Sequence, residues 1–387
     1  MQVPWGGVRD VVDAARANPE AVAAAFGVLL VVALGGYGLL RYRRPPGVRL
    51  RRLLDELDEV VVLTHPTPDP DAMASAMGVG TLAEQVGADV TLQYSGSIRH
   101  QENRAFRTVL DLEMDHVEDV SDLAAEAVVL VDHNEPRGFE GDDGVEPVAV
   151  VDHHPGSGGG EAFTDVRTDY GAAASIVAEH LSDVGAVPVP PDQHASEADA
   201  DFTVPSGVAT GLLYGLLSDT DRLTNGASAA DFDAASYLYP GVDDELLNRI
   251  ANPQVGSDVL ETKARAIAGR EVRGSFAVSD VGSIENVDAI PQAADELMRL
   301  EGVTAVVVCG ECDGVVRLSG RSRDDRVHMG RIIGSLADGC PGGSGGGHSR
   351  MGAGQIPVAR TDGDGGISEP ERTDLADRVF DALNGEG

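Results

Sequence analysis

The sequence is poor in lysine and cysteine, and each shortage argues against a class of protein. There is one lysine, Lys263, and the 29 basic residues face 64 acidic ones among 387, for a formal net charge of −35. Non-specific nucleic-acid binders gain affinity from basic side chains that displace counterions, so we expect no binding of long duplex nucleic acid. Three cysteines are too few for a disulfide scaffold. The spacing of Cys309 and Cys312 has no second pair, which favours reduced thiols over zinc or redox chemistry.

The acidic residues are dispersed in small clusters rather than gathered in one tail. A dispersed acidic surface keeps a protein soluble in concentrated salt, where ions screen its self-repulsion. We interpret it as adaptation to a high-salt cytoplasm, such as that of a halophilic archaeon.

One long uncharged run, residues 21–40, has the length of a membrane-spanning helix. Six arginines follow it between positions 41 and 52, and an arginine excess on that flank predicts a cytoplasmic C-terminal side. A signal peptide would carry its positive charge before the apolar core. We therefore expect a single-pass protein of the cell membrane with cytoplasmic catalytic domains.

The rest of the chain alternates short apolar runs with helical patterns, which predicts a parallel sheet covered by helices. We expect an α/β protein with an anchor and basic linker in residues 1–50, a catalytic domain in 51–252, and a smaller α/β substrate-binding domain in 257–387. The boundary is placed around Pro253.

Four apolar runs end in aspartate or histidine. They are followed by His65, Asp132, the triplet Asp152-His153-His154, and Asp219. Ligands of open α/β sheets bind at the carboxyl ends of the strands, so these side chains should meet at one edge. Carboxylates gathered in this way repel one another unless divalent cations neutralise them.

Asp69 and Asp71 follow His65 in a proline-rich loop before a helix. In an extended segment they would point to opposite sides and address two different metals. Mixed imidazole and carboxylate ligation suits manganese, iron or cobalt better than magnesium.

These segments resemble the four motifs of the DHH phosphoesterase superfamily, in order. The matching pieces are His65-Pro-Thr-Pro-Asp69-Pro-Asp71-Ala, Val131-Asp132-His133-Asn134, Val151-Asp152-His153-His154 and Ser218-Asp219-Thr220-Asp221. The superfamily includes RecJ-like exonucleases, nanoRNA-degrading enzymes, cyclic di-AMP phosphodiesterases and family II pyrophosphatases. The chain departs from the usual pattern at Thr67 and Pro70, which are not ligand positions.

The resemblance implies two divalent metal ions bridged by Asp132, and we expect the metal to be Mn²⁺. His65, Asp69 and Asp132 would hold one, and Asp71, Asp132, His153 and Asp219 the other. Asp152 would orient the histidines, while His154 and Ser75 would face the phosphate. The implied reaction is attack on phosphorus by a metal-activated hydroxide.

The C-terminal part resembles the superfamily's associated substrate-binding domain. Its implied substrate contacts are Arg321, Gly345, Gly346, Gly347 and His348, with glycine N–H groups approaching a phosphate. The glycine run taken alone is more typical of a flexible linker.

The expected function is hydrolysis of short nucleotides, namely cyclic di-AMP, linear dinucleotides or nanoRNA. The alternatives are a phosphoadenosine-phosphate phosphatase, a pyrophosphatase or exopolyphosphatase, and a membrane-bound nucleotide sensor without turnover. Expected partners are the small nucleotide or short oligonucleotide, the membrane, and a second copy in a homodimer.

Overall fold

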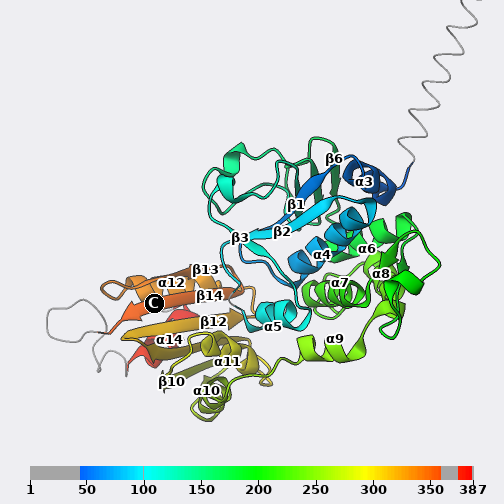
Figure 1. Ribbon diagram of the computed structural model, residues 1–387. Helices are drawn as coiled ribbons and strands as arrows, with labels where there is room; N and C mark the ends of the chain where they lie inside the picture. Colours follow the sequence, from blue (N-terminus) through cyan, green and yellow to red (C-terminus); the bar gives the residue numbers. More distant parts are fainter. Residues whose placement is uncertain (1–43, 99, 359–373, 386–387) are drawn as a thin grey trace, which may run out of the picture. The chain divides into compact units, whose positions relative to one another are not determined.

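The computed structural model describes residues 44–98, 100–358 and 374–385 (Figure 1). Its contacts divide the chain into two units between Ala251 and Asn252, except that residues 100 and 101 group with the second unit. The predicted membrane helix at 21–40 lies outside the described residues. Within the described ranges, no helix is long and apolar enough to cross a membrane.

The first unit is built on a six-stranded parallel sheet in the order β3-β2-β1-β4-β5-β6. The valine-rich runs that predicted strands form β1 and β4, whose residues are almost entirely buried. The strands are β1 Glu59–Thr64, β2 Asp89–Ser95, β3 Asp115–Val117, β4 Val128–Val131, β5 Ala149–Asp152 and β6 Phe163–Val166. The predicted α/β class with a parallel sheet is confirmed.

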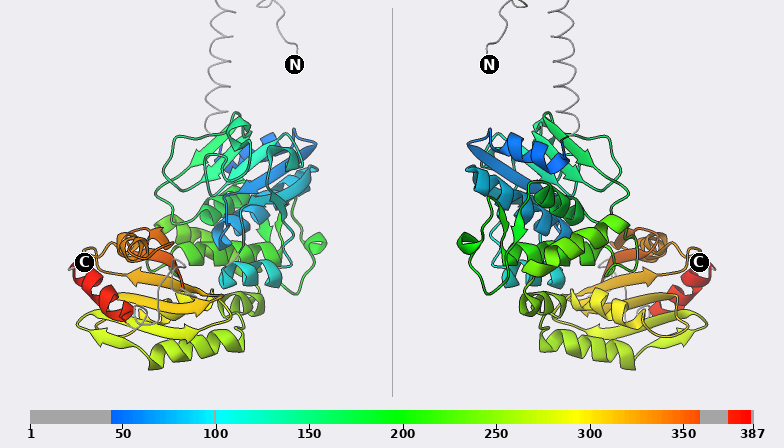
Figure 2. Two further views of the ribbon diagram at one scale, coloured as in Figure 1. Left: turned by 90° about the vertical axis from the view of Figure 1, so that its left-hand side faces the viewer. Right: turned by 90° about the vertical axis from the view of Figure 1, so that its right-hand side faces the viewer.

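The two faces of this sheet are covered differently (Figures 1 and 2). Helices α3, α4, α6 and α7 bury one face in the largest core cluster. The other face packs against the connections 118–127 and 132–145, whose only helical elements are two short 3-10 turns. The helices of the unit are α3 Pro46–Leu54, α4 Pro70–Val86, α5 Gln101–Val109, α6 Ala173–Asp183, α7 Ser206–Asp219, α8 Ala229–Leu238 and α9 Asp244–Ala251, and β7 Val187–Pro188 pairs with β8 Thr203–Val204.

Small residues allow α4 and α7 to approach closely. A Cβ added to Gly215 of α7 would lie 3.1 Å from the Cα of Asp71 and 3.1 Å from the carbonyl oxygen of Pro70. This contact brings the C-terminal half of α7, which ends at Asp219, against the first turn of α4.

The predicted basic linker, which ended at residue 50, is wrong for residues 46–50, because they belong to helix α3. Pro46 stands at the first helical position, where the missing N–H is not needed, and Leu50 and Leu54 are fully buried. Gly47 donates its N–H to Asp183 of α6 at 3.0 Å. A boundary at residue 50 therefore cuts through a helix that packs on the catalytic unit.

The second unit is a mixed six-stranded sheet in the order β13-β14-β12-β11-β10-β9, with helices on both faces (Figure 2). Its elements are α10 Ser257–Ala268, β9 Glu271–Arg273, β10 Phe276–Ser283, α11 Ala289–Leu297, β11 Ala305–Cys312, β12 Val315–Ser322, α12 Met329–Asp338, β13 Ser344–Gly347, β14 Met351–Pro357 and α14 Leu375–Asn384. The three cysteines are buried, and none of them forms a disulfide within the described residues. Cys309 packs in the core under α12 and α14, and Cys312 in the core under α10 and α11.

Replacement of Leu50 tests whether α3 is part of the catalytic unit. We expect Leu50→Ala to lower the free energy of unfolding by about 2–5 kcal/mol, because it leaves a cavity at a fully buried position. The exposed neighbour Arg52→Ala should change it by less than about 0.5 kcal/mol. Equal denaturant midpoints for the two variants would show that α3 is not packed as described.

Candidate metal centre

The carboxyl ends of three neighbouring strands deliver the predicted ligands to one edge of the first sheet. His65 follows β1, Asp132 follows β4, and Asp152 ends β5. The chain leaves β1 towards β2 on one side, whereas β4 lies on the other side. The site thus lies at the topological switch point, where open α/β sheets bind ligands.

The first ligand group combines His65, Asp69 and Asp132. The Nε2 atom of His65 lies 3.3 Å from Asp132 and 3.8 Å from Asp69. Asp69 is the N-cap of α4, and its Oδ1 accepts the N–H of Ala72 at 3.0 Å, while Oδ2 faces His65. The carboxylate of Asp69 therefore caps the N-terminus of α4 with one oxygen and belongs to the first ligand group with the other.

Asp132 lies at the centre of the site because of its backbone. Its N–H still donates to Val151 of β5, but its φ of 61° is left-handed. That conformation is uncommon for a side-chain-bearing residue, although aspartate tolerates it better than most. The turn directs its carboxylate, 1% exposed, to both His65 and His153.

Asp71 is held by helix α6. It lies in the first turn of α4, so the extended geometry assumed from the sequence is wrong, although Asp69 and Asp71 still join different ligand groups. Its two oxygens accept the N–H groups of Ala173 and Ala174 at 2.7 and 2.8 Å. The positive end of α6 favours a negative charge there.

The second ligand group combines Asp71, His153 and Asp219. The Nε2 atom of His153 lies 3.3 Å from Asp132, 3.5 Å from Asp219 and 3.9 Å from Asp71. Asp219 is the last residue of α7. A carboxylate at the C-terminal, negative end of a helix is unfavourable unless a cation accompanies it.

Hydrogen bonding fixes the direction of both histidines. The Nδ1 of His65 lies 2.9 Å from the Pro66 carbonyl, and that of His153 lies 3.3 Å from the Tyr170 carbonyl. A carbonyl only accepts, so each Nδ1 donates and each neutral ring aims its Nε2 lone pair at carboxylates. Asp132 Oδ1 and His153 Nε2 are buried without a hydrogen-bond partner. Lone pairs that face one another repel unless a proton or a metal ion lies between them, and an imidazole nitrogen beside a carboxylate oxygen is a donor set that fits a metal centre.

The pKa values express the same crowding. Burial, followed by the charges of Asp69 and Asp132, raises the pKa of Asp219 to about 7. Burial, followed by Asp132 and Asp219, raises the pKa of Asp71 well above its usual range. Burial by itself lowers the pKa of His65 and His153, but the carboxylates, Asp132 foremost, raise both to about 10. Protons would have to compensate the four carboxylates wherever metal does not.

Asp152 supports the histidine pair from behind. It accepts the N–H groups of His153 and His154 at 2.8 and 3.1 Å, and the side chain of Asn134 at 2.6 Å. Its Oδ1 lies 3.0 Å from the His154 Nδ1. His154 is 51% exposed, so its other ring nitrogen is available to a ligand. Asn134 was quoted in a motif but given no role, and its contact with Asp152 is visible only in the fold.

Two buried side chains differ from the sequence-based picture. Ser75 is fully buried in α4, and its hydroxyl has no hydrogen-bond partner, which does not fit the predicted contact with substrate. His133, for which no role was predicted, packs edge-on against His65 with 6.4 Å between the ring centroids. Burial lowers the pKa of His133 to about 4, and its Nδ1 pairs with the Val131 carbonyl at 2.9 Å. It is a neutral support for His65.

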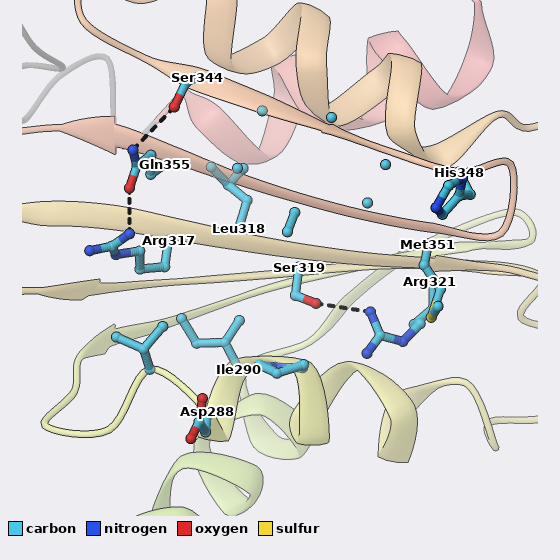
Figure 3. A pocket seen from close by; sticks show the side chains of 18 of the residues that line it. Asp288, Ile290, Arg317, Leu318, Ser319, Arg321, Ser344, His348, Met351 and Gln355 are labelled. Atoms are coloured by element: carbon cyan, nitrogen blue, oxygen red, sulfur yellow. Dashed lines mark hydrogen bonds between the residues drawn. The ribbon is translucent and has the colours of Figure 1, made fainter. Parts of the chain in front are cut away.

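The predicted substrate contacts of the second unit line a cavity of about 750 Å³ within that unit (Figure 3). The glycine run is not a loop, because Ser344–Gly347 forms edge strand β13, paired with β14. Arg321 is already engaged, since its Nε donates to Asp295 at 2.6 Å and its Nη1 to Ser319 at 3.0 Å. His348 lies at the same end of the cavity as Arg321.

Comparison with known proteins identifies both units. Residues 59–216 match the DHH family, N-terminal domain, and residues 273–382 match the DHHA1 domain. An uncharacterised protein of Methanocaldococcus jannaschii is 34% identical over 307 residues, which cover 77% of this chain and 58% of that protein. The cyclic-di-AMP phosphodiesterase GdpP of Geobacillus thermodenitrificans is 27% identical over 326 residues, which cover 79% of this chain and 46% of that protein. The chain thus spans about half the length of these two relatives.

The fold also resembles a solved structure, that of an exopolyphosphatase-related protein from Bacteroides fragilis. The TM-score is 0.59 at 14% identity, with 88% of this chain and 95% of that chain covered, a likeness of fold alone. The chain carries an N-terminal DHH-family domain followed by a DHHA1 domain, which makes it a member of the DHH superfamily.

Proposed function

We propose that the protein is a manganese-dependent phosphodiesterase that hydrolyses short nucleotides, with cyclic di-AMP, its linear dinucleotide product or nanoRNA as substrates. The observation that carries the proposal is the position of Asp132, whose carboxylate lies 3.3 Å from the Nε2 atoms of two histidines that belong to two ligand groups. Relatives named cyclic-di-AMP phosphodiesterases, 27% and 25% identical, support the substrate class.

His65, Asp69, Asp71, Asp132, His153 and Asp219 would hold two divalent cations. When bound, these cations supply a water of lowered pKa and neutralise charge on the phosphoryl oxygens. Mixed nitrogen and oxygen donors favour manganese over magnesium.

His154 is the residue that we assign to the phosphate. Asp152 fixes the orientation of its ring, and burial of Asp152 is offset by that hydrogen bond, so the pKa of Asp152 stays below its usual range. The hydrogen bond from His154 to Asp152 is the largest cause of the raised pKa of His154. A charged, half-exposed imidazole can donate to phosphoryl oxygens as negative charge develops on them.

Asp132→Asn tests the shared ligand. It keeps the side-chain volume and removes the charge that both ligand groups use, so we expect loss of bound manganese and a fall in hydrolysis of at least about a thousandfold. Metal content and product formation are measured on the same sample. The matched control is Asp325→Asn at an 87% exposed carboxylate, which should retain both. Near-normal turnover by Asp132→Asn would refute the assignment.

The stability of the metal-free protein should depend on pH. The pKa of the Asp219 carboxyl is about 7 in the folded protein but near 3.9 in the unfolded chain. The folded state therefore binds more protons than the unfolded state between about pH 4 and pH 7, and the excess fades by about pH 8. The free energy of unfolding should therefore fall as pH rises from 6 to 8, and the raised pKa values of His65 and His153 act in the same direction. Manganese should reverse the loss at pH 8, and Asp219→Asn should make the fall shallower while the part due to His65 and His153 remains, as thermal unfolding would show. An unchanged profile in Asp219→Asn would contradict this account.

The substrate is tested by product analysis with manganese in molar KCl. The panel is cyclic di-AMP, a linear diadenylate, a five-residue RNA, phosphoadenosine phosphate and pyrophosphate. Cleavage of the first three supports the proposal, and cleavage of only the last two would replace it with a phosphatase or pyrophosphatase. Binding of a nucleotide without formation of any product would support the alternative, a nucleotide sensor without turnover.

A further inference from the structure

The cavity of the second unit has a floor made by one face of three strands. Along β12, Arg317, Ser319 and Arg321 alternate with Val316 and Leu318, which lie in the core under α12 and α14. The face that carries Arg317 is therefore the one that α10 and α11 cover further along the sheet. Ile290 and Pro291 at the start of α11 form the facing wall.

The strand register sorts the floor into three cross-strand rows. Ser344, Gln355 and Arg317 form one row; Gly346, Ala353 and Ser319 form the middle row; Met351 and Arg321 form the third. The middle row has only small side chains, whereas both outer rows carry an arginine. The two arginines are four positions apart along β12, which corresponds to about 13 Å. The result is a slot with a flat floor and a polar group at each end (Figure 3).

The end formed by Gln355 has a fixed hydrogen-bonding direction. Arg317 donates from Nη1 to the Gln355 side chain, and a guanidinium can only donate, so the atom that it meets is the amide oxygen. The amide nitrogen then donates to the Ser344 hydroxyl at 3.1 Å. One oxygen lone pair and one N–H of Gln355 remain for a ligand. The Nε of Arg317 is also buried without a partner, which is unusual for a native donor.

We propose that this slot binds the adenine base of the substrate and that Gln355 determines the base specificity. A glutamine amide complements adenine through its N6 amino group and N7, one donor and one acceptor side by side. Guanine presents two acceptors at the same edge, so one of them would face the amide oxygen. The volume of about 750 Å³ and the aliphatic wall of Ile290 and Pro291 suit a planar base with its sugar. His348 and Arg321, at the far end, lie where a phosphate can bind.

The inference rests on the proposed function, whose substrates carry adenine, but it can fail separately. Equilibrium binding of 5′-AMP and 5′-GMP to the whole protein in EDTA needs neither metal nor turnover. We expect AMP to bind at least about tenfold more tightly than GMP, the contribution of one bidentate amide contact. Gln355→Met, of similar shape but without the amide, should reduce the preference to within about threefold.

Gly346→Val tests the slot itself. A Cβ at residue 346 would meet no atom within 4 Å, so the side chain fills the cavity without disturbing the fold. AMP should bind at least about tenfold more weakly to this variant, because the added methyl groups overlap the ligand. The matched control is Gly144→Val in the first unit, where a Cβ also meets no atom within 4 Å, and it should bind AMP as the unchanged protein does.

Equal affinity for AMP and GMP, or unchanged AMP binding by Gly346→Val with a normal melting temperature, would overturn the inference. Selective AMP binding by a protein that hydrolyses none of the diesters would refute the proposed function and leave the slot standing. Hydrolysis of dinucleotides without any base preference would support the proposed function and refute the assignment of Gln355 as the residue that determines base specificity.

Discussion

The repulsion among four carboxylates within one pocket is the constraint on which the catalytic unit is organised. Asp69, Asp71, Asp132 and Asp219 come from three separate segments, and no arginine or lysine pairs with them among the described residues. The fold offsets part of this repulsion by local means. The first turn of α6 donates to Asp71, the first turn of α4 donates to Asp69, and two imidazoles separate the acids. The two divalent cations that we propose would neutralise the negative charge that remains.

This constraint also explains the unusual backbone and the close helix packing at the site. Asp132 adopts a left-handed conformation that lets one carboxylate serve both histidines. Gly215 allows α7 to lie against α4 so that Asp219 reaches the second ligand group. Strained or tightly packed positions of this kind persist when the surrounding fold enforces them, and they are common at functional sites. Here the parallel sheet provides the enforcement, since β4 and β5 hold Asp132 and Asp152 on adjacent strands.

The ligand residues at the strand ends could be predicted from the sequence, because each buried apolar run that predicts a strand is followed directly by an aspartate or a histidine. The run ending before His65 is a strand with five buried residues, and all the proposed ligands meet at one sheet edge. What could not be predicted depends on contacts distant in sequence. Leu50 lies between two arginines in the sequence, and its burial depends on the packing of α3 against α6. The glycines before His348 have no strand propensity and form β13 only because β14 provides partners. The role of Gln355 follows from its register against Arg317, which local patterns do not contain.

Helix α6 joins two parts of the protein that are far apart in the sequence. Its first turn orients Asp71, and its last turn accepts Gly47 of α3, so both ends of an 11-residue rod are in use. A shortened protein that starts at residue 51 would lack Leu50 and would expose the apolar surface that Leu50 covers. Part of that surface belongs to α6, the helix whose first turn orients Asp71. A truncated protein should therefore begin ahead of Pro45, so that a loss of metal affinity caused by the missing part of α3 is not mistaken for a defect of the active site.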